Sequence, residues 1–278
     1  MSFRASARYC SANDPRPEPE RRRPLHCDAP GAGLASMAAV ILRANVKTPA
    51  RFRDRADAGR QLAQKVAAET GDQEVLVLGL PRGGVPVAHE VAQQLGAELD
   101  VFLVRKLGVP GHEELAMGAI AADGVRVLNE DVVQSLRIPA ATIEAVASAE
   151  QAVLASRERE YRGQAHRAAI RDRTVILVDD GLATGASMRA AILALRMLKP
   201  RAIIVAVPVA PVDTCAALER EADRVVCLST PAEFHGVGEW YEDFSQTTDE
   251  EVRALLARSQ SQHAQRCGLR LPRGQGQP

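Results

Sequence analysis

Aliphatic runs alternate with amphipathic helical patterns along the middle of this chain. The runs have almost no polar interruption, which is typical of parallel strands covered on both faces. The predicted strands are residues 74–80, 99–104, 174–178, 202–207 and 224–228. The predicted helices are residues 52–69, 85–95, 139–168, 186–198 and 212–222. This alternation predicts an α/β fold with a doubly wound, mainly parallel sheet and flanking helices.

Two segments fall outside the alternation. LGVPGHEELAMG (107–118) is rich in glycine and predicts a mobile lid that excludes water, and the runs AMGAIA and VRVL around it predict a hairpin-like flap. FHGVGEWYEDFSQTTDEEV (234–252) gathers aromatic residues after the last predicted strand, and it predicts a small C-terminal hood. Thr248 and Glu251 have the spacing of a capping box, so a short helix is expected to follow.

The composition is that of a soluble globular protein, with 46% hydrophobic and 25% charged residues. Lys plus Arg and Asp plus Glu both number 35, so no basic excess points to nucleic acid. The five cysteines are scattered, which argues against a disulfide framework or zinc site and favours the cytoplasm. The longest apolar run, residues 202–212, is too short to cross a membrane.

The polarity of the two ends predicts three regions. Residues 1–36 contain RPEPERRRP and no apolar period, so we expect a disordered leader there. Residues 37–258 hold the alternating pattern and should form the folded domain. Residues 259–278 are polar and end in Gly, Gln and Pro, so a disordered tail is expected.

The stretch VILVDDGLATGAS (175–187) joins an aliphatic strand to a helix through two acids and a loop of small residues. Asp179 and Asp180 follow the strand directly, at the carboxyl end where open α/β sheets bind ligands. Backbone N–H groups and hydroxyls before a helix suit a phosphate. This phosphate site is predicted from Gly181, Thr184, Gly185, Ala186 and Ser187. Two carboxylates repel phosphate, so the acids suit a sugar diol or a cation.

Two shorter polar segments also follow strand-like runs. After the first, Gly83 and Gly84 can turn N–H groups inward as an anion nest, and Arg82 adds a cationic fork. Arg105 and Lys106 follow the second. Taken alone, PRGG is also compatible with an ordinary strand–turn–helix connection, and Arg105-Lys106 with a solvated cationic pair at a strand end. Their coincidence at one edge of a parallel sheet predicts a site for a phosphorylated sugar.

The 175–187 stretch resembles the phosphoribosyl pyrophosphate (PRPP) motif of type I phosphoribosyltransferases. The series FRDR, PRGG, RKLGVPG, DDGLATGA and FHGVGEWY is similar to that of uncharacterised bacterial phosphoribosyltransferase-domain proteins, over about residues 50–250. Gly181 departs from the family pattern, which more often has an aliphatic residue there. No Walker-type loop is present, and no G-x-G-x-x-G motif follows a strand.

The resemblance implies transfer of ribose 5-phosphate from PRPP to a nitrogen acceptor, a base or an amine, with release of pyrophosphate. It implies oxocarbenium character at the ribose C1, and catalysis mainly by positioning and electrostatics. It assigns Asp179 and Asp180 to the ribose hydroxyls and residues 183–187 to the 5-phosphate. Arg82, Gly83, Gly84 and Lys106 are expected to hold the pyrophosphate, and Arg105 is expected to bind PRPP. Lys106, Asp179 and Asp180 are the expected catalytic residues. Mg²⁺ is the expected cofactor, bound chiefly through the ligand and waters.

The aromatic residues Trp240, Tyr241 and Phe244 have two interpretations. As a hood they would stack on a planar acceptor, and as a satellite cluster they would only cover the sheet edge. The activity is also open, because the fold could serve a non-enzymatic PRPP-sensing regulator or a hydrolase that uses water as acceptor. We expect a homo-oligomer, a dimer, with neither membrane nor nucleic acid as partner.

Overall fold

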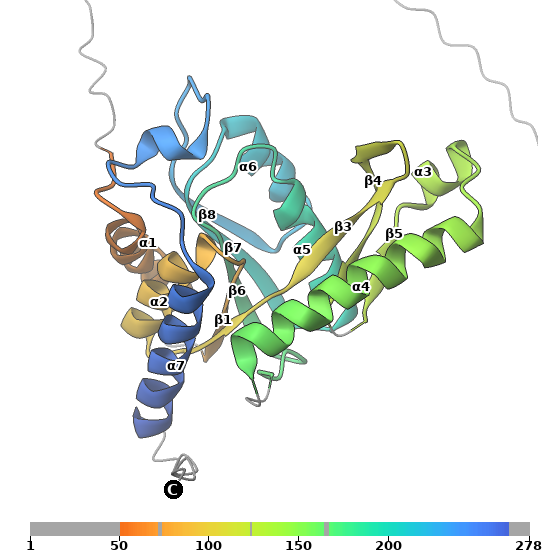
Figure 1. Ribbon diagram of the computed structural model, residues 1–278. Coiled ribbons are helices and arrows are strands. Elements are labelled where there is room, and N and C mark those ends of the chain that lie inside the picture. The colour runs from red at the N-terminus through yellow and green to blue at the C-terminus, as the bar shows by residue number, and fades with distance from the viewer. Residues whose placement is uncertain (1–50, 72–73, 123, 164–166, 267–278) are drawn as a thin grey trace, which may run out of the picture. The chain divides into compact units, whose positions relative to one another are not determined.

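The central element is a five-stranded parallel sheet with the strand order β2-β1-β6-β7-β8 (Figure 1). The computed structural model describes residues 51–71, 74–122, 124–163 and 167–266. The strands are β1 (Val75–Gly79), β2 (Glu98–Val101), β6 (Thr174–Val178), β7 (Ala202–Val209) and β8 (Arg224–Ser229). The predicted α/β fold with a doubly wound parallel sheet is therefore confirmed.

Both faces of this sheet are covered by helices. The helices α1 (Arg55–Thr70), α2 (Gly84–Leu95) and α7 (Asp249–Arg266) lie together, and α5 (Ala186–Met197) and α6 (Val212–Leu218) lie on the opposite side (Figure 1). Side chains along each strand therefore alternate between two apolar layers. Val77 and Ile176 belong to the first layer, and Leu76 and Val175 belong to the second. This double burial explains why the strands are unbroken aliphatic runs.

A second, antiparallel sheet is formed by β3 (Val104–Val109), β4 (His112–Ala121) and β5 (Arg126–Leu128). The hairpin-like flap predicted from AMGAIA and VRVL corresponds to β4 and β5, which pair antiparallel. Residues 107–118, which are expected to form a lid, belong to a β3–β4 hairpin in which Leu107 pairs with Gly118. Tertiary pairing thus gives regular structure to a glycine-rich segment that by itself resembles a loop.

Two helices connect this sheet to the rest of the domain: α3 (Glu130–Ser135) and α4 (Ala140–Arg162). We predicted one helix over 139–168, but the helix ends at Arg162 and is followed by Gly163, which has φ 56°. The short helix α3 was not predicted. Its N-cap is Asn129, whose side chain accepts a hydrogen bond from the Val132 N–H at 3.3 Å.

The prediction of a disordered tail from residue 259 is wrong for residues 259–266. Helix α7 continues to Arg266, and Ser259 and Ala264 are buried. Ser259 Oγ hydrogen-bonds to Nδ1 of the buried His89 on α2 at 2.7 Å. A serine and an alanine occupy core-facing positions, so the apolar period is weak in the sequence. The domain therefore extends beyond residue 258, and the predicted leader 1–36 lies outside the described residues.

Candidate active site

The candidate site lies at the carboxyl ends of β1 and β6. These neighbouring parallel strands pair from Val75–Thr174 to Gly79–Val178. The chain moves outward from β1 to β2 on one side and from β6 to β7 and β8 on the other. The β1/β6 boundary is therefore the topological switch point, where open α/β sheets bind their ligands.

Two glycines allow the loop after β1 to touch the loop after β6. A Cβ added at Gly83 would lie 2.0 Å from Oδ2 of Asp180. A Cβ added at Gly84 would lie 2.7 Å from the Val178 carbonyl oxygen and 2.8 Å from the Asp179 Cα. The predicted pyrophosphate loop and the acid pair are thus in direct contact, and side chains at either glycine would separate them.

Asp179 and Asp180 are both half-buried. The Asp180 N–H donates to Oδ1 of Asp179 at 2.9 Å. Burial raises the pKa of Asp179 well above its usual range, and the adjacent Asp180 charge raises it further. Burial also raises the pKa of Asp180, while Arg55 opposes that shift. A pair of buried, repelling carboxyls is costly without a ligand and is suited to a cation or hydroxyl donors.

Arg55 is a site residue that the sequence analysis did not select. Its Nε donates to Oδ2 of Asp180 at 2.8 Å, and the two side chains are only 12% and 14% exposed. Its Nη1 donates to the Ser245 carbonyl at 2.7 Å, and its guanidinium lies 4.0 Å from the centre of the Phe244 ring. The signal was the FRDR motif at residues 52–55, to which no role was assigned.

The loop after β6 has the features predicted for a phosphate site. Ala183, Thr184 and Ser187 are exposed or half-buried, and α5 begins at Ala186. Gly185 precedes the helix with φ 70°, in the left-handed region that favours glycine. Thr214 of α6 donates from its hydroxyl to the Ala183 carbonyl at 2.9 Å, so α6 holds the loop from outside.

A cleft of about 310 Å³ lies beside the acid pair. Arg82 and Arg105 line it with Asp179 and Ser187, so these predicted residues are brought together. Lys106 is not among the cleft residues. Its Nζ lies 3.6 Å from Oε2 of Glu114, and it lines a neighbouring cavity instead.

The prediction that Arg105 and Lys106 directly follow the second parallel strand is therefore wrong. β2 ends at Val101, and both residues lie within β3 of the antiparallel sheet. Successive side chains of a strand point to opposite faces, so Arg105 and Lys106 diverge. Arg105 pairs with Glu150 of α4 at the cleft.

The predicted hood is tied to the beginning of α1. The Phe52 N–H donates to the Trp240 carbonyl and the Glu242 N–H to the Phe52 carbonyl, both at 2.8 Å. Tyr241 is only 3% exposed. Its ring contacts Phe52 and Phe244, with ring centres 5.5 and 5.0 Å away.

The Tyr241 hydroxyl donates to the Asp180 carbonyl at 2.5 Å. Its ring is enclosed by two other rings, so the acceptor-stacking role predicted for Tyr241 does not fit this structure. Phe244 is 37% exposed and Trp240 is half-buried. These two residues keep the predicted role open.

Gly181 joins the acid pair to the hood. Its φ of 157° is rare for residues with side chains, and an added Cβ would lie 2.5 Å from Cγ1 of Val237. The Val237 side chain thus occupies the space that an aliphatic residue at position 181 would need. Glycine at position 181, where the resembling family more often has an aliphatic residue, therefore leaves room for the Val237 side chain of the hood.

We expect Gly181→Ala to lower the free energy of unfolding by about 2 kcal/mol, because the new methyl group overlaps Val237 and the backbone is strained. Gly181→Ala combined with Val237→Ala should recover part of that loss. Urea denaturation of the single and double variants measures both effects. Equal destabilisation by the single and double variants would show that Val237 does not limit position 181. Gly236→Ala is the control, since an added Cβ there has no neighbour within 4 Å.

The two carboxylates of the acid pair fit a Mg²⁺ ion whose remaining coordination positions are filled by a ligand and waters. Within residues 51–71, 74–122, 124–163 and 167–266, no group of three or more His, Cys, Asp or Glu side chains could hold a metal. Asp179 and Asp180 supply two carboxylates, and Mg²⁺ commonly uses one or two with substrate phosphates and waters. In the described part of the chain, no helix is long and apolar enough to cross a membrane.

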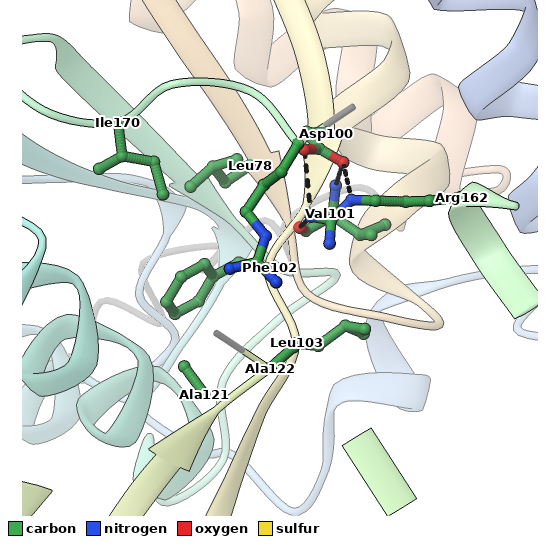
Figure 2. A pocket seen from close by; sticks show the side chains of 10 residues that line it. Leu78, Asp100, Val101, Phe102, Leu103, Ala121, Ala122, Arg162 and Ile170 are labelled. Atoms are coloured by element: carbon green, nitrogen blue, oxygen red, sulfur yellow. Dashed lines mark hydrogen bonds and ion pairs between the residues drawn. The ribbon is translucent and has the colours of Figure 1, made fainter. Parts of the chain in front are cut away.

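A smaller cavity of about 10 Å³ is lined by residues of β1, β2 and β4 and by the last residue of α4 (Figure 2). Its lining includes Leu78, Phe102 and Ile170, with the ion pair of Asp100 and Arg162 at its wall. A space of this size holds at most about one water molecule. It is therefore a packing feature, whereas the open cleft beside Asp179 is large enough to hold a ligand.

Comparison with known proteins agrees with this geometry. The model of the phosphoribosyl transferase domain matches residues 51–243, from the FRDR motif to the hood. The chain belongs to the type I phosphoribosyltransferase family. The switch-point site, the glycine loop and the acid pair all lie within the matched residues.

Two relatives come from Mycobacterium tuberculosis, MT0597 of strain CDC 1551 and Rv0571c of strain H37Rv, both provisionally named phosphoribosyl transferases. Each is 50% identical over 214 residues, which is 77% of this chain and 48% of the relative. This chain therefore spans about half the length of these relatives. The crystal structure of TT1426 from Thermus thermophilus is 46% identical, with a TM-score of 0.69. That match covers 75% of this chain and 98% of TT1426.

Proposed function

We propose that this protein transfers ribose 5-phosphate from PRPP to a nitrogen of a small-molecule acceptor and releases pyrophosphate. The observation that carries the proposal is the meeting of three elements at the switch point. The glycine loop after β1 contacts the acid pair after β6, and the exposed phosphate loop follows that pair. PRPP has a diphosphate, a ribose diol and a phosphate ester, which match these elements in chemistry.

Each element has a role in the proposed reaction. Asp179 and Asp180 accept hydrogen bonds from the ribose hydroxyls, and Arg55 favours the ionised form of Asp180 and orients its carboxylate. Residues 183–187 hold the 5-phosphate with backbone N–H groups and hydroxyls. Arg82 and Arg105, which line the cleft, bind the leaving pyrophosphate through charge-assisted hydrogen bonds. Mg²⁺, held by the acids and the ligand, would neutralise charge on the pyrophosphate as it leaves.

The acceptor is proposed to bind beneath the hood, beside the ribose. Phe244 keeps 37% of its surface exposed and lies next to Arg55, which contacts Asp180. A planar base or amine could stack there, since aromatic faces favour flat heterocycles. The scattered cysteines support a cytoplasmic location, and the family resemblance supports a homodimer.

The acid pair gives the test of this function. Asp179→Asn with Asp180→Asn should weaken binding of PRPP with Mg²⁺ at least about tenfold, or ~1.4 kcal/mol, because both charges are removed at constant size. Calorimetric titration measures the affinity. Unchanged affinity in a folded double variant would reject the assignment. Tight PRPP binding without pyrophosphate release, across a panel of bases and amines, would favour the regulator instead.

Asp179→Asn alone separates loss of binding from loss of folding. The pKa of Asp179 is raised in the folded state, so its contribution to stability is present below the unfolded pKa of about 3.9 and is lost as pH rises through the folded pKa. At pH 7 the raised pKa of Asp179 therefore lowers the stability of the folded state. Asp179→Asn should therefore be more stable than the wild type at pH 7, and the difference should shrink near pH 4. Thermal melts at both pH values test this.

A further inference from the structure

Helix α4 brings a third arginine to the cleft. Arg157 lines it together with Arg82 and Arg105, and its side chain is 45% exposed. The three guanidinium groups come from different elements: the loop after β1, strand β3 and helix α4. Such a cationic cleft beside Asp179 and Ser187 suits a ligand with more than one phosphate group.

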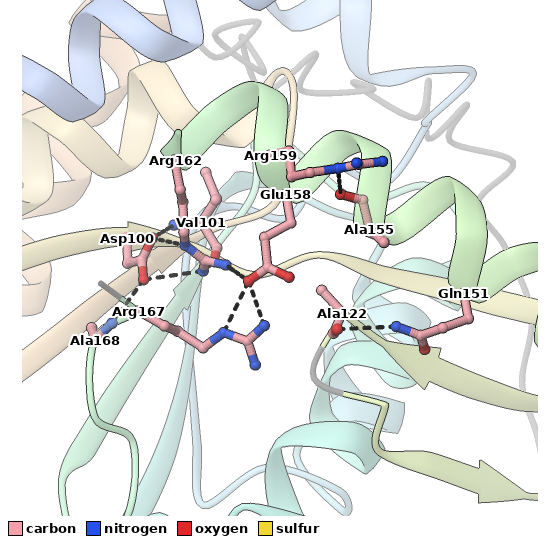
Figure 3. A network of polar contacts seen from close by, with 10 residues as sticks. All are labelled: Asp100, Val101, Ala122, Gln151, Ala155, Glu158, Arg159, Arg162, Arg167 and Ala168. Atoms are coloured by element: carbon pink, nitrogen blue, oxygen red, sulfur yellow. Dashed lines mark hydrogen bonds and ion pairs between the residues drawn. The ribbon is translucent and has the colours of Figure 1, made fainter. Parts of the chain in front are cut away.

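Helix α4 is fixed to the parallel sheet close to Arg157. Arg162, five residues further along, binds Asp100 of β2 through Nε and Nη2, both at 3.0 Å (Figure 3). The Arg162 and Asp100 side chains are only 6% and 5% exposed. Arg162 also donates to the Val101 carbonyl at 2.7 Å. This buried, bidentate contact holds the helix, so the position of Arg157 is set by the fold.

A carboxylate outside the cleft lining orients Arg157. The Arg157 Nη1 donates to Oδ2 of Asp249, the first residue of α7, at 3.0 Å. Asp249 also accepts a hydrogen bond from the Tyr161 hydroxyl at 2.5 Å and lies 3.8 Å from Nη1 of Arg82. Asp249 therefore contacts two of the three cleft arginines.

We propose that Arg157 binds the pyrophosphate group of the substrate and that Asp249 is a positioning residue acting through Arg157. The inference rests on the proposed function and adds residues that lie outside the loops after β1 and β6. Guanidinium groups from three elements can surround a diphosphate, whereas one loop contacts it from a single side. The Asp249 carboxylate behind Arg157 keeps the guanidinium in place before the ligand arrives, which reduces the ordering cost of binding.

The first experiment is calorimetric titration of the full chain with pyrophosphate in the presence of MgCl₂. Arg157→Gln should weaken binding about tenfold or more. Arg159→Gln is the matched control, because Arg159 is exposed on the same helix and donates to the Ala155 carbonyl of that helix. It should bind pyrophosphate like the wild type. Arg157→Lys should give an intermediate affinity, since the charge remains and the fork is lost.

The second experiment is a double-mutant cycle. Asp249→Asn should weaken pyrophosphate binding in the wild-type background and weaken it clearly less in the Arg157→Gln background, where only the longer contact of Asp249 with Arg82 remains. A structural role for Asp249 alone would give the same loss in both backgrounds and would overturn the positioning role. Thermal melts verify that each variant is folded at the titration temperature.

The outcomes separate this inference from the proposed function. If the wild type binds pyrophosphate and Arg157→Gln binds it equally well, the role of Arg157 is wrong and the proposed function stands. If Arg157→Gln and Arg159→Gln lose affinity equally, the effect is general electrostatics and the inference also fails. If the wild type binds neither pyrophosphate nor PRPP, the proposed function itself is wrong and the inference fails with it.

Discussion

Arg55→Met is expected to lower the free energy of unfolding by about 3 kcal/mol, which is typical when one partner of a buried ion pair is removed. The variant leaves Asp180 without its guanidinium partner in a largely buried position. It also removes the hydrogen bond to the Ser245 carbonyl and the contact with the Phe244 ring. Urea denaturation at pH 7 measures the loss.

Two further variants make this result specific. Asp180→Asn in the Arg55→Met background should restore part of the stability, because the unpaired charge is then absent. Arg60→Met on the same helix is the control. Arg60 is 46% exposed, and its guanidinium nitrogens lie 3.6 Å from the Glu90 carboxylate and 3.8 Å from the Asp57 carboxylate, so these ion pairs should contribute little. Equal losses for Arg55→Met and Arg60→Met would mean that the contact with Asp180 contributes little.

Gly83→Ala is expected to reduce PRPP affinity about 100-fold, or ~2.7 kcal/mol. The new methyl group would overlap Oδ2 and Cγ of Asp180, at 2.0 and 2.7 Å. Asp180 is held by Arg55, so the carboxylate and the loop after β1 must move apart. That movement would misplace the ribose contacts and the pyrophosphate loop together. Calorimetric titration with PRPP and Mg²⁺ measures the effect.

Gly236→Ala provides the comparison for this substitution, because its added methyl group meets nothing within 4 Å. It should leave PRPP affinity unchanged. If Gly83→Ala also binds PRPP like the wild type, the close approach of the two loops is not required for the ligand. A crystal structure of Gly83→Ala would then show whether Asp180 has turned away without consequence.

The two acids of the candidate site differ in their charged partners. Asp180 has a guanidinium partner in Arg55, which opposes the rise of its pKa, whereas the pKa of Asp179 is raised well above its usual range by burial and by the adjacent Asp180. A ligand or cation that pairs with Asp179 would offset the unfavourable free energy of placing its carboxylate beside Asp180 in a half-buried site. This arrangement explains why binding residues at such sites are often unfavourable for stability.

The sequence alone determined the parallel sheet and its main site. The unbroken aliphatic runs at 74–80 and 174–178 predicted buried strands, because a strand covered on both faces has no polar side. The acids, small residues and glycines that follow those runs predicted ligand loops at one edge. These signals are local, since each depends on a strand and the residues immediately after it.

Other features depended on contacts between distant segments. The segment 104–121 became a hairpin through cross-strand pairing, which separated Arg105 from Lys106. Arg55 reached the site across 125 residues, and Tyr241 was enclosed by two aromatic rings. The sequence therefore determined the loops after β1 and β6 that are proposed to bind the ligand, because their chemistry is local. Only the tertiary structure decided which arginines face the cleft and which aromatic faces stay open, because packing partners distant in the chain set the direction of those side chains.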